Sequence, residues 1–216
     1  MAGFSILGPP QVHGDGPPVR TAEAGLLVAL ASSANALIDA RRLAEARWEH
    51  PPPDAGAQLE AAVAALRRVL RSAGPRVAGR LVSRDHGHLL LVEPGELDLD
   101  RFVVLFRQGR AALDADDPYA AAHFLGEALA VWRGPVGAGA RMYGWLRHRV
   151  TEIEQLRAAA AEGRLVARLN LGQTRQVSVD TSALPDRVRQ LLRLALVPAP
   201  PRGTDWILPP GDRTSR

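Results

Sequence analysis

The sequence QLEAAVAALRRVLR, at residues 58–71 of this 216-residue chain, predicts an amphipathic helix. Leu59, Val63, Leu66 and Leu70 recur at helical intervals, so they form one apolar stripe that belongs in a core. We expect this helix to extend over residues 55–72. Asp54 stands immediately before it, where a carboxylate can cap the free N–H groups of the first turn.

The elements on both sides of this helix complete a small domain. A short strand is predicted at residues 4–7, and a turn at Asp15-Gly16 leads towards Val19. Helices are predicted at residues 23–34 and 40–48, and the prolines at 51–53 end the second one. A hairpin is predicted from residues 80–83 and 89–92 around a turn at 85–87. A strand, three helices and a closing hairpin indicate a winged helix-turn-helix, which we assign to residues 1–96.

From residue 97 onward the apolar periodicity is entirely helical. Phe102, Leu105, Phe106 and the residues that follow indicate a first helix, and Asp117-Pro118 supplies a cap and a first-turn proline for a second helix ending near Trp132. A third helix is predicted at residues 143–171. Such helices resemble tetratricopeptide pairs, so we expect a TPR-like helical domain at 97–197, including a last helix at 185–197, and then a Pro-rich tail at 198–216. The expected fold class is mostly α with small β-sheets.

Composition excludes several kinds of chemistry. All 27 basic residues are Arg and none is Lys, so neither a Schiff-base lysine nor a P-loop lysine exists, and the absence of Cys rules out disulfides and thiolates. There is no GxSxG or HExxH motif and no paired-carboxylate constellation, so we expect a protein that is not an enzyme and has no cofactor. His86 and His88 lack a third ligand nearby, so we expect a hairpin surface and no metal. Without a secretion signal or a membrane span, a cytoplasmic location is predicted.

Several segments together resemble the SARP family, the antibiotic-pathway regulators of actinomycetes. They are Phe4-Ser5-Ile6-Leu7-Gly8-Pro9, the spacing from Asn35 to Leu43 before Trp48 and its prolines, Leu66-Arg67-Arg68, RLVSRDHGHLLLVEPGELDLDRF at 80–102, and EALAVWRGP at 127–135. The resemblance implies a response-regulator-type winged helix followed by a bacterial transcriptional activator domain. If DNA binding is retained, the residues that could contact DNA are Gln58, Arg67, Arg68, Arg71, Arg80 and Arg84.

The departures from the family fall on the expected DNA-reading surface. Ala22-Glu23-Ala24 replaces a basic entry to the first helix. The helix at residues 55–72, which is the recognition helix of this family, carries Glu60, Ala61, Ala62, Ala64 and Ala65. Alanine cannot make the hydrogen bonds that discriminate between bases. Asp85 stands at the tip of the wing. Residues 1–100 carry 10 Arg against 12 acidic residues, whereas residues 101–216 carry 17 Arg against 11. This distribution is unusual for a winged helix that holds a polyanion.

These departures favour a non-catalytic accessory subunit that binds and stabilises another protein, such as an enzyme of a secondary-metabolite pathway. The family's helical domain continues through further helix pairs, so a chain that degenerates after residue 172 is expected to leave an apolar face for the tail or a partner to cover. Aromatic and Arg side chains are the usual anchors of such an interface, and the candidates are Trp132, Tyr143, Trp145, Arg147 and Trp206.

Two other hypotheses remain open at this stage. The first is a pathway-specific transcriptional activator that uses the surviving arginines on DNA and the helical domain on RNA polymerase. The second is a ligand-sensing module that uses a groove of the helical domain, supported by the Trp, Tyr and Arg cluster. Binding to promoter DNA and its salt dependence would distinguish the activator from the accessory subunit.

Overall fold

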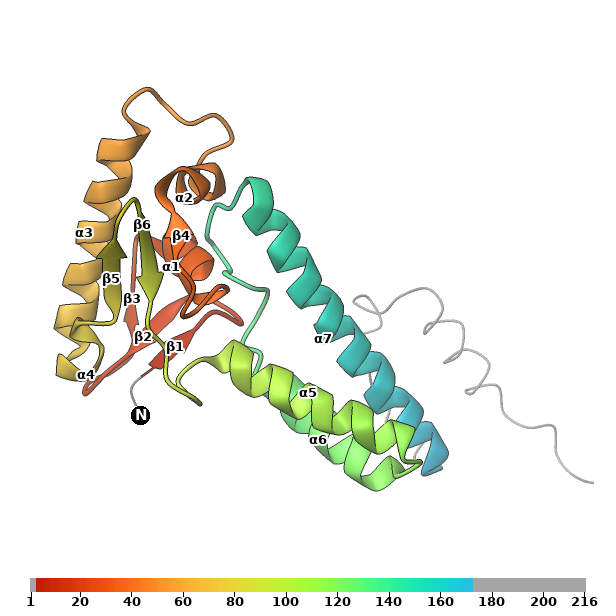
Figure 1. The fold of residues 1–216 in the computed structure, drawn as a ribbon. Coiled ribbons are helices and arrows are strands. Elements are labelled where there is room, and N and C mark those ends of the chain that lie inside the picture. Colours follow the sequence, from red (N-terminus) through yellow and green to blue (C-terminus); the bar gives the residue numbers. More distant parts are fainter. Residues whose placement is uncertain (1–2, 173–216) are drawn as a thin grey trace, which may run out of the picture. The chain divides into compact units, whose positions relative to one another are not determined.

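A small antiparallel sheet begins the computed structural model, which describes residues 3–172 (Figure 1). Its strands are β1 (Gly3–Ser5), β2 (Gln11–His13) and β3 (Val19–Arg20), in the order β1-β2-β3. Phe4 pairs with Val12, and Val12 pairs with Val19. The sequence predicted the first strand and the turn towards Val19, but β2 was missed because three residues among prolines and glycines carry almost no periodicity.

Three helices follow, as predicted, and a short fourth was not expected. They are α1 (Ala24–Ala31), α2 (Ala40–Arg47), α3 (Ala55–Ala73) and the single-turn α4 (Pro75–Ala78). The buried side of α3 is the expected stripe of Leu59, Val63, Leu66 and Leu70. Asp54 has the predicted position before α3, but the predicted hydrogen bond to the first turn is absent. Asp54 stands at the N-cap position with ψ near 20°, and its carboxylate accepts from the Gln58 side chain instead of a backbone N–H.

The predicted hairpin is part of a three-stranded wing sheet. Strands β5 (Leu81–Arg84) and β6 (Gly87–Leu90) pair antiparallel, and β4 (Ile38–Asp39), which precedes α2, pairs with the other edge of β6. Asp85 occupies the turn with a φ of 48°, a conformation that Asp tolerates better than most residues. β4 is only two residues long and was not predicted. Its pairing ties the start of α2 to the wing.

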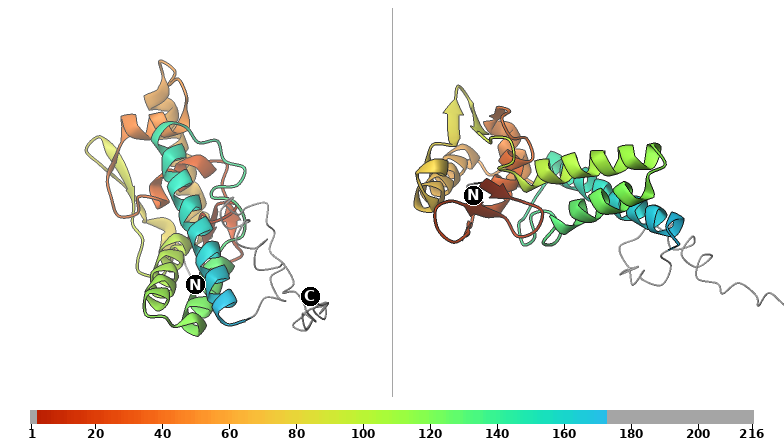
Figure 2. Two further views of the ribbon diagram at one scale, coloured as in Figure 1. Left: turned by 90° about the vertical axis from the view of Figure 1, so that its right-hand side faces the viewer. Right: turned by 90° about the horizontal axis from the view of Figure 1, so that it is seen from below.

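The rest of the described chain is a three-helix arrangement. Helices α5 (Asp98–Asp114) and α6 (Pro118–Ala130) form an antiparallel pair, and α7 (Gly144–Asn170) runs alongside them in both views of Figure 2. The predicted cap is present, because the Asp117 carboxylate accepts from the N–H of Ala120 at 3.0 Å. α5 and α6 approach closely at Gly109, where an added Cβ would lie 2.5 Å from Leu125 Cγ. The fold is therefore a winged helix with a TPR-like helical part, as expected.

One hydrophobic cluster extends from the N-terminal sheet into the helical part. It includes Phe4 and Leu7 on one side, and Phe102, Leu125 and Ile153 on the other. The loop between α6 and α7 donates backbone hydrogen bonds from Arg133 to Leu7, from Gly137 to Ile6 and from Ala138 to Gly8. Gly8 has a φ of 146°, and a Cβ there would lie 2.8 Å from Arg133 Cβ, so this close approach requires glycine.

A buried carboxylate fixes the same junction. Asp98 accepts from the backbone N–H groups of Ile6 and Leu7 at 2.8 to 3.0 Å and pairs with the Arg133 guanidinium at 3.4 Å. Burial raises the pKa of Asp98, although the two N–H donors and Arg133 act in the opposite direction. The boundary assigned at residue 96 remains a prediction, because core and hydrogen bonds cross it. Over residues 3–172, no helix is long and apolar enough to cross a membrane.

Candidate functional site

The solvent-exposed face of α3 is divided into two halves. Ala57, Ala61, Ala64, Arg68 and Arg71 recur at helical intervals along one exposed stripe, opposite the buried leucines. The first half of the stripe presents methyl groups and the second half presents guanidinium groups. A helix exposed in this way, beside a hairpin, has the position of a recognition helix next to a wing.

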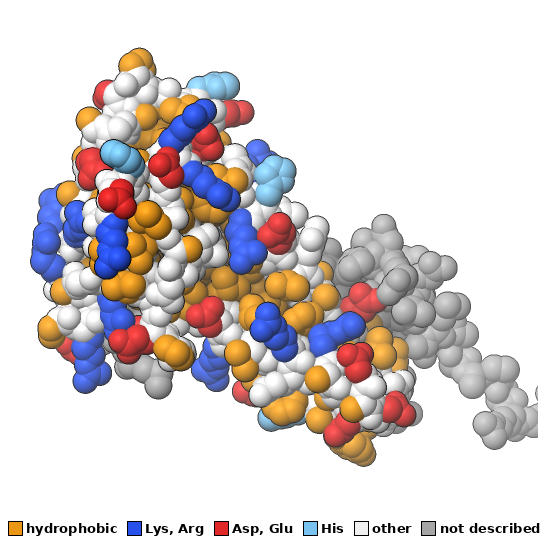
Figure 3. All heavy atoms as spheres, viewed as in Figure 1, with side chains coloured by type: hydrophobic (Ala, Val, Ile, Leu, Met, Phe, Trp, Pro, Cys, Tyr) orange, Lys and Arg blue, Asp and Glu red, His pale blue; other side chains and the backbone are white. Residues whose placement is uncertain are grey.

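Arginine side chains surround the second half of this helix. Arg68, Arg71 and Arg84 are exposed, and none forms an ion pair within the described part of the chain. Figure 3 shows basic side chains along the side of the molecule where α3 lies in Figure 1. We name Arg68, Arg71 and Arg84 the exposed arginine set. They are available to phosphate groups without first breaking an ion pair.

Two other predicted DNA contacts are held by the protein itself. Arg80 is only 18% exposed and pairs with Glu93 at 2.9 Å and with Glu96 at 3.1 Å. Its charge is therefore neutralised locally, and its side chain stabilises the connection to the helical part. Gln58 is exposed, but its amide donates to the Asp54 carboxylate at 3.0 Å. These positions remain predictions as DNA contacts, and each would have to exchange a partner for DNA.

A polar chain that the sequence did not reveal connects α3 to the wing. Arg67 donates to the Ser83 hydroxyl at 2.6 Å, Ser83 is bonded to Nδ1 of His88 at 2.6 Å, and Nε2 of His88 is 3.1 Å from the Glu60 carboxylate. His88 is 3% exposed. The expectation that His88 lies on a hairpin surface is therefore wrong. It fixes the recognition helix against the wing, and no periodic signal marks such a residue.

Replacing His88 by Leu is expected to lower the free energy of unfolding by about 0.5–1.5 kcal/mol, because it removes the hydrogen bond between the buried imidazole and the Ser83 hydroxyl. Urea unfolding followed by circular dichroism measures the change. Glu60→Gln is the matched control at the other end of the contact. Since the Glu60 side chain is 64% exposed, it should cost less than about 1 kcal/mol. Equal losses in both variants would contradict a structural role for His88.

Most of the acidic and alanine positions that suggested an eroded DNA surface have a structural role within the fold. Glu23 forms a salt bridge with Arg47, and both side chains are largely buried, so its charge does not face solvent unpaired. Ala62 is buried in the core and Ala65 is half-buried, so neither belongs to the reading face. Glu60 serves His88. Of the residues that motivated the idea, Ala22, Ala61, Ala64 and Asp85 are exposed without such a role.

Three of the predicted partner-binding residues lie together at the start of α7. The Trp145 indole donates to the carbonyl of Arg42 at 2.7 Å, and the Arg42 guanidinium lies 4.8 Å from the centre of that ring. Tyr143 and Arg147 line a pocket of about 340 Å³ against the end of α2. This cluster, Tyr143, Trp145 and Arg147, remains a candidate for a protein interface.

The other two predicted anchors are not in that cluster. Trp132 is 8% exposed and packs edge-on against Phe102 at 5.1 Å, under the guanidinium of Arg157. Its ring is a core element in this structure, so contact with a partner there would require the helices to open. Trp206 lies outside the described residues, as does the helix predicted at 185–197. Within residues 3–172 no group of three His, Asp or Glu side chains could hold a metal ion.

Comparisons with known proteins identify relatives along most of the chain. Residues 97–188 match the model of the bacterial transcriptional activator domain. The transcriptional regulatory protein EmbR of Mycobacterium tuberculosis is 30% identical over 187 residues, which cover 84% of this chain and 48% of EmbR. The transcriptional regulator RedD of Streptomyces coelicolor is 35% identical over 171 residues, which cover 72% of this chain and 48% of RedD.

A solved structure gives the same result. Mycobacterium tuberculosis EmbR in complex with a low-affinity phosphopeptide has a TM-score of 0.75 and 27% identity, covering 90% of this chain and 54% of that chain. The chain thus spans about half the length of the EmbR and RedD relatives it matches. These relatives are named transcriptional regulators, which contradicts the accessory-subunit hypothesis. The prediction of a partner-binding subunit is therefore wrong, and the pairing of Glu23 with Arg47 removes one of the observations on which it was based.

Proposed function

Since the chain belongs to the SARP family of regulators, we propose that it is a DNA-binding, pathway-specific transcriptional activator of a secondary-metabolite gene cluster. In this proposal residues 1–96 bind DNA and residues 97–197 form the activator-type domain. The observation that carries the proposal is the exposed arginine set, which lies on α3 and the wing without ion-pair partners in residues 3–172. The family relation also argues against an enzymatic role.

The two halves of the α3 stripe suggest separate tasks. Arg68, Arg71 and Arg84 supply phosphate contacts, which position the protein on the duplex. Ala61 and Ala64 let the helix approach closely but offer base edges only apolar contact. The domain has few unpaired cations, so its affinity for a single site should be modest and should fall less steeply with salt than that of a domain with more phosphate contacts.

Fluorescence anisotropy with labelled duplexes tests the proposal. We expect the whole chain to bind duplexes from the promoters of its own gene neighbourhood more tightly than a shuffled duplex of the same composition. The logarithm of the association constant should fall with the logarithm of salt concentration with a slope of about −3, roughly 0.9 for each of three phosphate contacts. Absence of binding to every promoter duplex at about 50 mM salt would reject the proposal.

We also propose a protein partner for the helical part, in accordance with an activator's need to contact the transcription machinery. The EmbR relative is in complex with a phosphopeptide, which supports a role of protein contacts among these relatives. On this chain the cluster of Tyr143, Trp145 and Arg147 is the proposed surface, and RNA polymerase is the proposed partner. Arg147 is exposed, so Arg147→Ala should weaken co-purification with RNA polymerase without affecting folding.

A further inference from the structure

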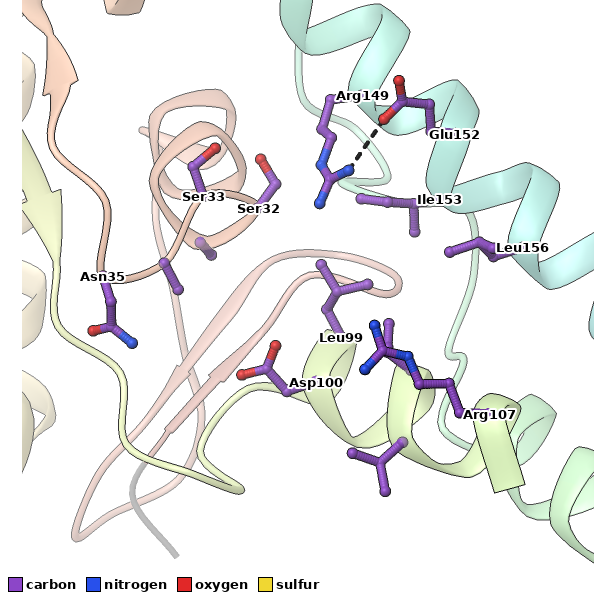
Figure 4. Close-up of a pocket in the computed structure, with 14 residues that line it drawn as sticks. Ser32, Ser33, Asn35, Leu99, Asp100, Arg107, Arg149, Glu152, Ile153 and Leu156 are labelled. Carbon is purple, nitrogen blue, oxygen red and sulfur yellow. Dashed lines mark hydrogen bonds and ion pairs between the residues drawn. The ribbon is translucent and has the colours of Figure 1, made fainter. Parts of the chain in front are cut away.

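A pocket of about 510 Å³ lies between the winged helix and the helical part (Figure 4). Its walls come from the end of α1 and the residues after it, from the first turns of α5, and from α7. The volume is within the range of sites that bind small organic molecules, which is about 300–1,000 Å³. The walls belong to segments far apart in sequence, so a molecule bound there would contact both parts of the protein at once.

Polar and apolar groups line the pocket together. Ser32, Ser33 and Asn35 face it from the α1 side, while Arg107 on α5 and Arg149 on α7 extend into it from the helical side (Figure 4). The apolar lining consists of Ala31, Ala34, Leu99, Val103, Val104, Ile153 and Leu156. A neighbouring pocket of about 530 Å³ shares Asn35, Asp100 and Val104 with it and adds mainly apolar walls from Val92, Pro94 and Leu105.

The charges in the pocket are only partly compensated. Arg149 pairs with Glu152 at 3.1 Å. Arg107 forms no ion pair, and Asp100 forms none either, in the part of the chain that the structure describes. Burial, and then the nearby charge of Asp98, raise the pKa of Asp100. The pocket therefore offers a guanidinium without a partner, a carboxylate that can accept from a donor, and apolar side chains between them.

We propose that this pocket binds a small amphipathic organic acid that also carries a hydrogen-bond donor. Arg107 would hold the acid group, as guanidinium groups commonly do, and Asp100 would accept from the donor. Leu99, Val103 and Ile153 would cover the apolar body. Ligand binding by these residues does not require that the chain also binds DNA.

The position of Asn35 gives such a ligand a path to the wing. Its N–H donates to the carbonyl of Leu90, and its side chain both donates to and accepts from the backbone of Val92. Asn35 also has a φ of 63°, so its conformation depends on these bonds. A ligand that contacts Asn35 therefore contacts a residue that holds the end of the wing strand β6.

A fluorescent amphipathic acid provides the experiment. 8-Anilinonaphthalene-1-sulfonate has apolar rings, a sulfonate and an N–H donor, and we expect it to titrate the folded whole chain at one saturable site. Arg107→Ala should weaken this site at least tenfold, since it removes the charge-assisted contact. Arg110→Ala is the matched control, because Arg110 is exposed on the same helix and does not line the pocket. It should change the affinity less than twofold.

Two further probes make the result decisive. N-phenyl-1-naphthylamine lacks the sulfonate, so any binding it shows should not depend on Arg107. Octanoate, followed by titration calorimetry, tests a smaller acid and should show the same dependence on Arg107. Equal affinities of Arg107→Ala and Arg110→Ala for the sulfonate would overturn the proposal. So would a lack of saturable binding of both acids by wild-type chain whose circular dichroism shows it folded.

Discussion

Replacing Arg68, Arg71 and Arg84 together by Ala is expected to weaken binding to a promoter duplex about a thousandfold. Each charge-assisted hydrogen bond to a phosphate contributes roughly 1.5 kcal/mol, and three such losses amount to about that factor. The three side chains are exposed, so the fold should not change. The salt dependence is the sharper measurement, because its slope should become smaller by nearly one for each phosphate contact removed.

A control with the same change in net charge separates local contacts from overall charge. Arg101, Arg110 and Arg147 are also exposed, but they lie in the helical part. Their triple Ala variant should bind DNA within about threefold of the wild type, because none of the three lies on α3 or the wing and exposed charges outside the contact surface are screened by salt. Equal effects of the two triple variants would show that α3 and the wing do not form the DNA interface.

Replacing Asp98 by Ala is expected to cost about 3 kcal/mol of unfolding free energy. The carboxylate is 10% exposed, and its loss leaves the buried N–H groups of Ile6 and Leu7 without an acceptor and Arg133 without its ion pair. Guanidinium unfolding measures the loss. Asp100→Ala is the matched control two residues away. Its carboxylate accepts no such pair of N–H groups, so a comparable loss there would contradict the explanation.

The pH dependence of the Asp98 contribution has a definite sign. Because the pKa of Asp98 is raised in the folded protein, the folded state binds a proton more readily than the unfolded state. The free energy of unfolding of the wild type minus that of Asp98→Asn should therefore increase as pH falls through the raised pKa of Asp98. It should level off below the ordinary aspartate pKa of 3.8. A difference that decreases on acidification would mean that the hydrogen bonds to the carboxylate outweigh its burial.

The fold could be predicted from the sequence where periodicity is long. The stripe from Leu59 to Leu70 and the capped start of α6 at Asp117 both follow from spacing and residue type. Strands β2 and β4 and helix α4 have two to four residues each, which is too short for a periodic signal. Their existence depends on tertiary pairing, such as that between Ile38 and His88.

The candidate site was harder to predict, because a sequence shows which charges exist but not which are paired. Glu23 suggested a repelling charge, and the structure places it in a salt bridge with Arg47. Arg80 suggested a phosphate contact, and it is held by Glu93 and Glu96. The network through His88 joins residues up to 28 positions apart. Only the fold brings such partners together, so the sequence could not show that Glu23 and Arg80 are paired while Arg68, Arg71 and Arg84 form no ion pair within residues 3–172.

The backbone bonds that Arg133, Gly137 and Tyr143 donate to Leu7, Ile6 and Ala46 have a consequence for recombination between related genes. A chimera that joins the first 96 residues of one regulator to the remainder of another must also match these surfaces. Where Gly8 is replaced by a bulkier residue, the incoming loop would have no room to dock. The first 96 residues and the helical part of one chain are therefore expected to fit together better than those of two different relatives.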